Sequence, residues 1–273
     1  MKRPLKNGSI ARPEERGQQE PTDVGDLART TRTPLENILK RSLTFILDLL
    51  YPRYCIACGQ RMRKGGHYLC HTCEAKIMFI KTACTRCGAP FWGETDTRVC
   101  NVCRDQVLAF QSARSLFAYD GVGKELIHTF KYRNGRYLET DWIRLLKGQP
   151  DFLSFFTDAT LVPVPLSKKK RHQRGFNQSE RLAHCISKLT LAPIEPLLLK
   201  TRETPSQTQL NRQQRSQNVK NSFSLNPHMT LVPEKRYIVV DDVFTTGATL
   251  NACATTLKKA GATHISVATL AHG

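Results

Sequence analysis

Four short apolar stretches after residue 108 have the length and the residue types of buried β-strands. We predict these strands at Ala113 to Tyr119, Ala159 to Pro165, Tyr237 to Val240 and Ile265 to Leu270. Apolar residues between them recur at helical spacing, which predicts helices over Gly123 to Arg133, from Asn177 onward and over Leu250 to about Lys259. Strands that alternate with helices favour a mostly parallel, twisted sheet. Residues 109–273 are therefore predicted to form one α/β domain.

The beginning of the chain has a different pattern. Residues 1–32 are polar, charged and poor in large apolar side chains, so we predict a disordered basic tail. Apolar residues then recur at helical spacing over 33–52, after a capping box, and Pro52 ends the pattern. This predicts an amphipathic helix. Such a helix either packs on the body of the protein or contacts a membrane surface or a partner, since Lys40 and Arg41 flank its apolar face.

Residues 53–108 contain four C-x-x-C pairs, and the arrangement of the first two pairs recurs in the last two, which suggests an internal duplication. Tetrahedral zinc needs four soft ligands, and a C-x-x-C pair delivers two thiolates from one tight turn. A segment this short also needs a metal to compensate for its small core. We therefore predict a double zinc-ribbon module with two structural sites. Their ligands are Cys55, Cys58, Cys70 and Cys73 for one site, and Cys84, Cys87, Cys100 and Cys103 for the other.

Other interpretations of these cysteines stay open. The two sites can be crossed, as in interleaved modules, and an iron–sulfur cluster is a further alternative. Disulfides are disfavoured because the chain shows no secretory signal. His67 and His71 lie close enough in sequence to replace a ligand, although four cysteines per site make this unnecessary. Cys185 and Cys253 fall in helical patterns and are interpreted as small core residues.

The strand predicted at residues 237–240 is followed by two adjacent acids and the turn T-T-G-A-T. In open α/β sheets, ligands bind at the carboxyl ends of strands. A Gly-containing turn that opens a helix offers unpaired N–H groups to a phosphate, and carboxylates suit sugar hydroxyls or a hydrated Mg²⁺. The pattern predicts a sugar-phosphate site formed by Asp241, Asp242, Thr245, Thr246, Gly247, Ala248 and Thr249.

Two alternatives to that prediction remain. The stretch can be a strand–turn–helix unit that binds nothing, or a pocket that binds a sugar phosphate without catalysing a reaction. The second alternative is kept because no obvious general base for an acceptor can be named.

A dense basic run at residues 167–175 follows one predicted strand and precedes a predicted helix, and we interpret it as a loop. Its arginines suit a diphosphate by bidentate contact, and its glycine allows close approach of the backbone. The phosphates of nucleic acid compete for the same charges, and a solvated basic loop is the alternative without a ligand. The residues expected at a diphosphate or a DNA backbone are Arg171, Arg174, Gly175, Lys131 and Arg212.

The polar segment from Lys200 to Phe223 is rich in Gln and Arg and poor in apolar residues. Such a segment is typical of a mobile loop. A second interpretation is a lid that closes over the ligand and excludes water.

The net charge of +18 predicts attraction to polyanions such as nucleic acid or anionic membrane surfaces. Two four-cysteine zinc sites would lower it to about +14. The sequence contains no apolar run of the length that spans a bilayer, and no apolar segment follows the basic start of the chain. We therefore expect a cytoplasmic protein, with peripheral association at the inner face of the cytoplasmic membrane as a further option.

These motifs together resemble the ComF family of competence-associated, phosphoribosyltransferase-like proteins. The resemblance runs nearly end to end, and only the tail before about residue 33 falls outside it. Besides the cysteine pairs, it rests on F-K-Y-R-N-G-R-Y at 130–137, V-P-V-P at 162–165, R-H-Q-R-G-F-N-Q at 171–178, K-T-R-E-T-P-S-Q-T-Q-L at 200–210, N-V-K-N-S-F at 218–223 and V-V-D-D-V-F-T-T-G-A-T at 239–249.

The resemblance implies a type I phosphoribosyltransferase-like sheet behind the zinc module. It also implies a role in natural transformation, where internalised single-stranded DNA crosses the inner membrane, and a helicase-like DNA translocase as partner. By resemblance, Asp241 and Asp242 would hold the ribose and Mg²⁺ of phosphoribosyl pyrophosphate (PRPP), and residues 245–249 its 5′-phosphate. Whether phosphoribosyl transfer occurs stays open. The rival hypothesis is a single-strand DNA-binding module whose bases stack on Tyr132, Tyr137, Phe176 or Trp92.

Overall fold

The computed structural model describes residues 52–62, 66–93, 98–132, 135–201 and 221–273. The predicted tail and almost all of the predicted amphipathic helix lie outside the described residues. Arg212 and most of the predicted lid lie outside them as well.

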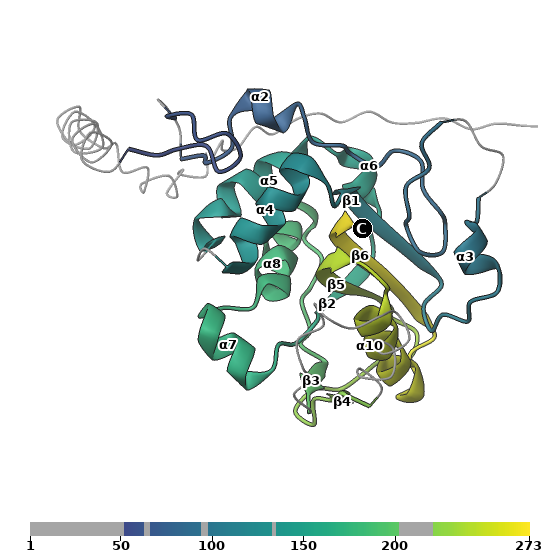
Figure 1. The fold of residues 1–273 in the computed structure, drawn as a ribbon. Helices are drawn as coiled ribbons and strands as arrows, with labels where there is room; N and C mark the ends of the chain where they lie inside the picture. Colours follow the sequence, from purple (N-terminus) through teal and green to yellow (C-terminus); the bar gives the residue numbers. More distant parts are fainter. Residues whose placement is uncertain (1–51, 63–65, 94–97, 133–134, 202–220) are drawn as a thin grey trace, which may run out of the picture. The chain divides into compact units, whose positions relative to one another are not determined.

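Four parallel strands form the main sheet, in the order β1-β6-β5-β2 (Figure 1). Their bounds are Ser112–Ala118 for β1, Ala159–Pro163 for β2, Arg236–Phe244 for β5 and His264–His272 for β6. The sequence placed all four strands correctly, but it ended the third too early. Strand β5 continues through Asp241 and Asp242 to Phe244, because β6 runs beside it as far as His272 and supplies partners.

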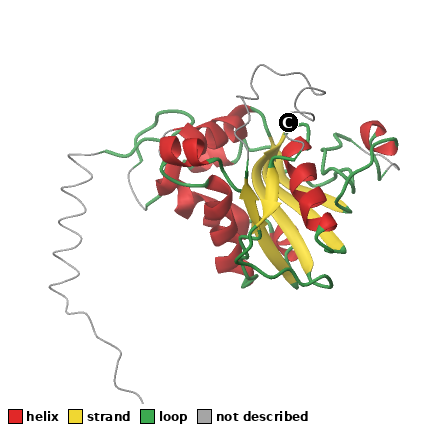
Figure 2. Ribbon diagram, turned by 90° about the horizontal axis from the view of Figure 1, so that it is seen from below, coloured by secondary structure: helices red, strands yellow, loops and turns green. Residues whose placement is uncertain are grey.

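Helices cover both faces of this sheet (Figure 2). Their packing divides the core into two clusters: alternate residues of β5, Ile238 and Val240, belong to one, and Tyr237 and Val239 to the other. One face carries α4 (Gly121–Tyr132), η1 (Gly135–Leu138), α5 (Glu139–Lys147), α6 (Pro150–Ser154) and α8 (Gln178–Thr190), and the other α10 (Ala248–Lys259). None of the helices in the described ranges is long and apolar enough to cross a membrane.

The basic run is a helix, α7 (Lys168–Arg174), so its interpretation as a loop was wrong. The Ser167 hydroxyl accepts a hydrogen bond from the Lys170 N–H at the first turn, and Gly175, with φ of 72°, ends the helix in the left-handed conformation. Lys and Arg are good helix formers, and the caps at Ser167 and Gly175 mark the two ends of the helix. No residue of α7 is buried, so the run carried no apolar periodicity that could have revealed a helix.

Two short antiparallel strands, β3 (Leu198–Lys200) and β4 (Phe223–Leu225), pair outside the main sheet. They flank the segment predicted as a lid, whose residues 202–220 lie outside the described residues. The ends of that segment are therefore held together beside the cavity described below.

The cysteine-rich region consists of two ribbons of the same local structure. In each, the glycine after the C-x-x-C pair is left-handed (Gly59, φ 71°; Gly88, φ 75°), and its N–H donates to the carbonyl of the first cysteine. The later pair of each ribbon frames a one-turn helix, α2 (His71–Glu74) or α3 (Asn101–Arg104). The first ribbon, Cys55 to Cys73, contributes to the α4–α8 core, and the second ribbon, Cys84 to Cys103, to the α10 core.

Candidate functional site: a strand-end cavity and two cysteine clusters

A cavity of about 320 Å³ opens where β2 and β5 end. Both predicted acids line it, as do all residues of the predicted phosphate turn, 245–249. Chain segments far apart in the sequence complete its wall, and their lining residues are Tyr119, Lys131, Tyr132, residues 164–167, Lys170, Arg174, Gln178 and Lys200.

The two acids are held differently. Asp242 has a side chain only 5% exposed and pairs with Lys131 of α4, with 3.1 Å between Oδ2 and Nζ. Asp241 accepts a hydrogen bond from the Ser179 hydroxyl (2.8 Å) and one from the Asp242 backbone N–H (2.9 Å), both on Oδ1. An ammonium group thus already neutralises part of the charge of the acid pair.

Burial and the neighbouring Asp242 raise the pKa of Asp241 to about 6, and the effects of Lys131 and Ser179 only partly offset this. Burial by itself would lower the pKa of Lys131, but the attraction of Asp242 and Asp241 outweighs it and raises that pKa. Lys131 therefore stays charged at neutral pH, and Asp241 changes charge close to it.

The phosphate turn depends on Gly247. This residue has φ of 71° and precedes α10, and a Cβ atom there would lie 2.5 Å from Cζ of Phe244. The N–H groups in the first turn of a helix lack intrahelical acceptors and carry the positive end of its dipole. Because Ala248, Thr249 and Leu250 line the cavity, this end of α10 is available to an anion.

Basic side chains line the cavity as well. Lys170 and Arg174 come from α7, and Lys200 comes from β3. The Arg174 guanidinium lies 5.2 Å from the centre of the Tyr132 ring. Burial and the nearby Lys170 lower the pKa of Lys200. An anion bound in the cavity would favour the charged form of this amine and raise its pKa again.

Several other predicted residues within the described ranges do not line this cavity. Arg171 is 60% exposed and pairs with Glu180 at 2.9 Å. Gly175 ends α7 and does not line the cavity. Of the stacking candidates, Phe176 is buried in the core, Trp92 is exposed away from the cavity lining, and Tyr132 is exposed and lines the cavity. Sequence reasoning placed Lys170 in the basic run but did not single it out as a site residue, and it did not name Ser179; the V-P-V-P strand end and the Asn177 helix start were the available signals.

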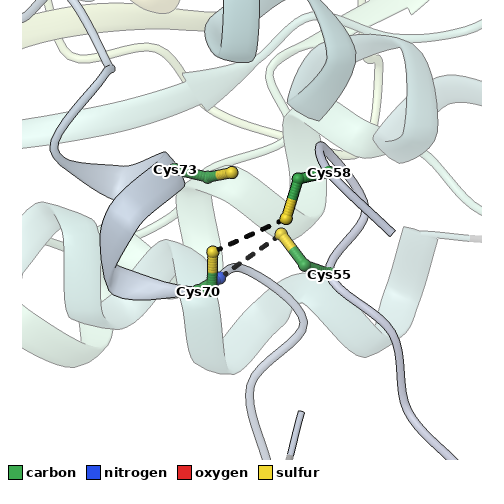
Figure 3. Close-up of side chains that lie close together, drawn as sticks. All are labelled: Cys55, Cys58, Cys70 and Cys73. Carbon is green, nitrogen blue, oxygen red and sulfur yellow. Dashed lines mark hydrogen bonds between the residues drawn. The ribbon is translucent and has the colours of Figure 1, made fainter. Parts of the chain in front are cut away.

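The eight clustered cysteines form two separate groups, and within each the sulfurs lie within 4.8 Å of one another. Figure 3 shows the first, with 3.8 Å between the Cys58 and Cys70 sulfurs; the Cys87 and Cys100 sulfurs of the second are 3.7 Å apart. Zinc–sulfur bonds of about 2.3 Å give tetrahedron edges of about 3.8 Å, so both groups fit zinc. The consecutive pairing is confirmed: each group takes its four ligands from one ribbon.

Backbone N–H groups support one sulfur of each group, that of Cys55 or Cys84, as a thiolate. The Cys70 N–H points to the Cys55 sulfur (3.5 Å), and the Cys100 N–H to the Cys84 sulfur (3.3 Å). Burial by itself would raise the pKa of Cys55 and Cys84, but these and further hydrogen bonds lower both to about 7. His71 is not a member of its cluster and lies beside Glu74 on the surface.

The parallel sheet with helices on both faces, behind a double zinc ribbon, defines the class of protein: a phosphoribosyltransferase-type α/β domain with an N-terminal zinc module. Family models agree with this class. A double zinc ribbon domain matches residues 46–110, and a phosphoribosyl transferase domain matches residues 198–273.

Three relatives extend the match to most of the chain. Competence protein ComFC of Bacillus subtilis is 30% identical, over 72% of this chain and 81% of the relative. Competence protein F of Haemophilus influenzae is 28% identical (78% and 94%), and DNA utilization protein YhgH of Escherichia coli is 29% identical (80% and 96%). The chain belongs to the ComF family.

Two solved structures show weaker likeness. A purine phosphoribosyltransferase from Pyrococcus horikoshii has a TM-score of 0.29 at 19% identity, covering 50% of this chain and 74% of that one. The allosteric regulatory enzyme of purine biosynthesis has a TM-score of 0.28 at 26% identity, covering 44% and 24%. The fold class rests on the sheet and the family models instead.

Proposed function

We propose that the strand-end cavity binds a sugar phosphate of the PRPP type, and that the protein acts in natural transformation by supporting the transport of internalised single-stranded DNA. The observation that carries the binding proposal is the cavity wall: the acid pair, the phosphate turn and basic side chains from α4, α7 and β3 all line one cavity. The names of the relatives, two competence proteins and a DNA utilization protein, support the cellular role.

In this proposal, each part of the ligand meets the chemistry that suits it. The phosphate turn and the start of α10 take the 5′-phosphate, and Asp241 and Asp242 take the vicinal hydroxyls of the ribose. Lys170, Arg174 and Lys200 are in reach of the diphosphate. Mg²⁺ enters with the diphosphate, since it prefers phosphate, carboxylate and water oxygens and keeps several waters.

Calorimetric titration of PRPP with Mg²⁺ into zinc-replete protein tests this proposal. The variant Asp241→Asn/Asp242→Asn is expected to lose binding, while Asp151→Asn, which changes an exposed acid on α6, is expected to keep it. A wild-type protein that binds no PRPP, or a double variant that binds as tightly as the wild type, contradicts the proposal.

An active phosphoribosyltransferase is the second candidate, and the raised pKa of Asp241 favours it. An acid whose pKa is about 6 accepts and releases protons near neutral pH, as a general acid or base must. The reaction would form a bond from an acceptor to the anomeric carbon of the ribose and release pyrophosphate with its electron pair. Pyrophosphate release that depends on an added nucleophile, and that Asp241→Asn abolishes, is the expected result.

We further propose that α7 meets the phosphate backbone of single-stranded DNA and that a helicase-like translocase is the partner. The support is the composition of α7, whose side chains are basic and not buried. Binding of an oligonucleotide is expected to weaken steeply with salt, and Lys168→Gln/Lys169→Gln to make that dependence shallower. Asp241→Asn serves as the control, because it leaves α7 unchanged.

A further inference from the structure

Phe244 is the last residue of β5 and lies directly beneath the phosphate turn. Its ring is buried, and its Cζ lies so close to Gly247 that a Cβ there would be only 2.5 Å away. The position of this ring therefore limits how closely the turn can approach the end of β5. It thereby sets the position of the N–H groups at the start of α10.

Two rings hold Phe244 from the other sides. His272 stacks on it, with 4.9 Å between ring centres and 11° between planes. Phe110 meets it edge-on at 6.4 Å. His272 is partly buried, and Cys87, a cysteine of the second zinc site, belongs to the same buried cluster as Phe244 and Phe110. The second ribbon thus supports the ring that supports the turn.

A separate contact joins the same two regions. The Ala109 N–H, directly after the second ribbon, donates to Oδ1 of Asn251 at 2.7 Å. The Asn251 N–H in turn donates to the carbonyl of Gly247 at 2.8 Å. The chain that leaves the second ribbon therefore holds the first turn of α10 as well.

The first ribbon is docked at a different place. The N–H groups of Tyr68 and Leu69 donate to Asp141 of α5, and Arg144 of α5 pairs with Glu74. Both ribbons are built alike, so the first is a matched internal control for the second.

We propose that Phe244 is a positioning residue for the phosphate turn, and that the second zinc site, unlike the first, is coupled through it to ligand binding in the cavity. The inference rests on the proposed binding of a sugar phosphate. Coupling between two binding sites is reciprocal, so PRPP must raise the zinc affinity of the second site by the factor by which that zinc raises the affinity for PRPP.

The matched variants Cys100→Ser and Cys70→Ser test the proposal, because the two cysteines occupy equivalent places in the two ribbons and are both half-buried. In ligand-free protein, Cys100→Ser is expected to speed hydrogen–deuterium exchange at residues 244–251, whereas Cys70→Ser is expected to leave it unchanged. In calorimetry, Cys100→Ser is expected to weaken PRPP binding by about fivefold or more, the lower end for coupled sites. Equal effects of the two variants, or none from Cys100→Ser, overturn the proposal.

Ring substitutions test the same link without touching a zinc ligand. His272→Ala removes the ring that supports Phe244 and is expected to weaken PRPP binding, while His272→Phe keeps a ring there and is expected to restore it. Equal affinities of the two variants contradict the positioning role. If the wild type binds no PRPP at all, the proposed function fails, but the exchange measurement still decides whether the second ribbon holds the turn.

Discussion

Asp141 and Asp241 are both acids within the folded domain, but the structure surrounds them differently. Asp141 is fully buried, accepts hydrogen bonds from Tyr68 and Leu69, and lies 3.3 Å from Arg144. Asp241 stands next to a second acid and faces a cavity, and its pKa is raised. An acid whose oxygens are satisfied within the chain stabilises the fold, whereas an acid kept beside another at a cavity is typical of a functional site.

Removal of zinc is expected to have the largest effect of all on stability, and this effect concerns the region around Asp141, where the first ribbon packs on α5. Structural zinc contributes an apparent ~10–16 kcal/mol in isolated zinc fingers, and here Cys55 and Cys73 belong to the same core as α5. A strong chelator should therefore lower the melting temperature and abolish near-UV circular dichroism, and added zinc should restore both. Zinc loss with an unchanged melting temperature would contradict a structural role for the metal.

Asp141→Ala is expected to destabilise the protein by about 3–5 kcal/mol, because it leaves the N–H groups of Tyr68 and Leu69 without their acceptor and leaves Arg144 with one acid instead of two. Urea unfolding monitored at equilibrium measures this loss. Asp151→Asn, on the surface of α6, provides the control and should stay within about 0.5 kcal/mol of the wild type. A similarly small change for Asp141→Ala would show that the first ribbon does not depend on this acid.

Gly247→Ala is expected to cost about 1–3 kcal/mol, since a left-handed non-glycine residue is strained and its Cβ would meet the Phe244 ring. Gly175→Ala separates the two causes, because Gly175 has nearly the same φ, 72°, but nothing within 4 Å of its Cβ. We expect Gly247→Ala to lose more stability than Gly175→Ala and to lose PRPP binding as well. Equal losses of stability would mean that the contact with Phe244 is unimportant.

The same comparison shows which parts of the molecule the sequence could predict. The acid pair and the phosphate turn are contiguous in the chain, and the cysteines repeat with regular spacing, so local patterns are enough to identify both. The docking of the first ribbon on Asp141 joins segments about 70 residues apart, and no local pattern marks it. Helix α7 was missed because its residues are all polar, and the length of β5 depends on its neighbour β6.

Helix α5 escaped prediction although its apolar spacing was present. Trp142, Leu145 and Leu146 lie at helical intervals and are fully buried. The polar residues between them and the short length of the helix concealed the pattern. In the sequence alone, its buried acid, Asp141, cannot be told from a surface residue. Burial of Asp141 becomes favourable only when the N–H groups of the first ribbon arrive, which is a property of the folded chain.

The smallest expected effect is a change in pH dependence, and it contrasts the cavity acid with the docking acid most directly. The folded-state pKa of Asp241 is raised from 3.8 to about 6, so the folded protein holds this proton more tightly than the unfolded chain does. The contribution of this bound proton to the stability of the folded protein is therefore complete below about pH 4. It is lost as pH rises through about 6. Asp241→Asn should remove that loss and make the protein more stable at pH 7 by about 1 kcal/mol or more, while it abolishes PRPP binding. Urea unfolding of both proteins at pH 5 and pH 7 measures the difference, and a variant that is less stable than the wild type at pH 7 would mean that Asp241, like Asp141, stabilises the fold.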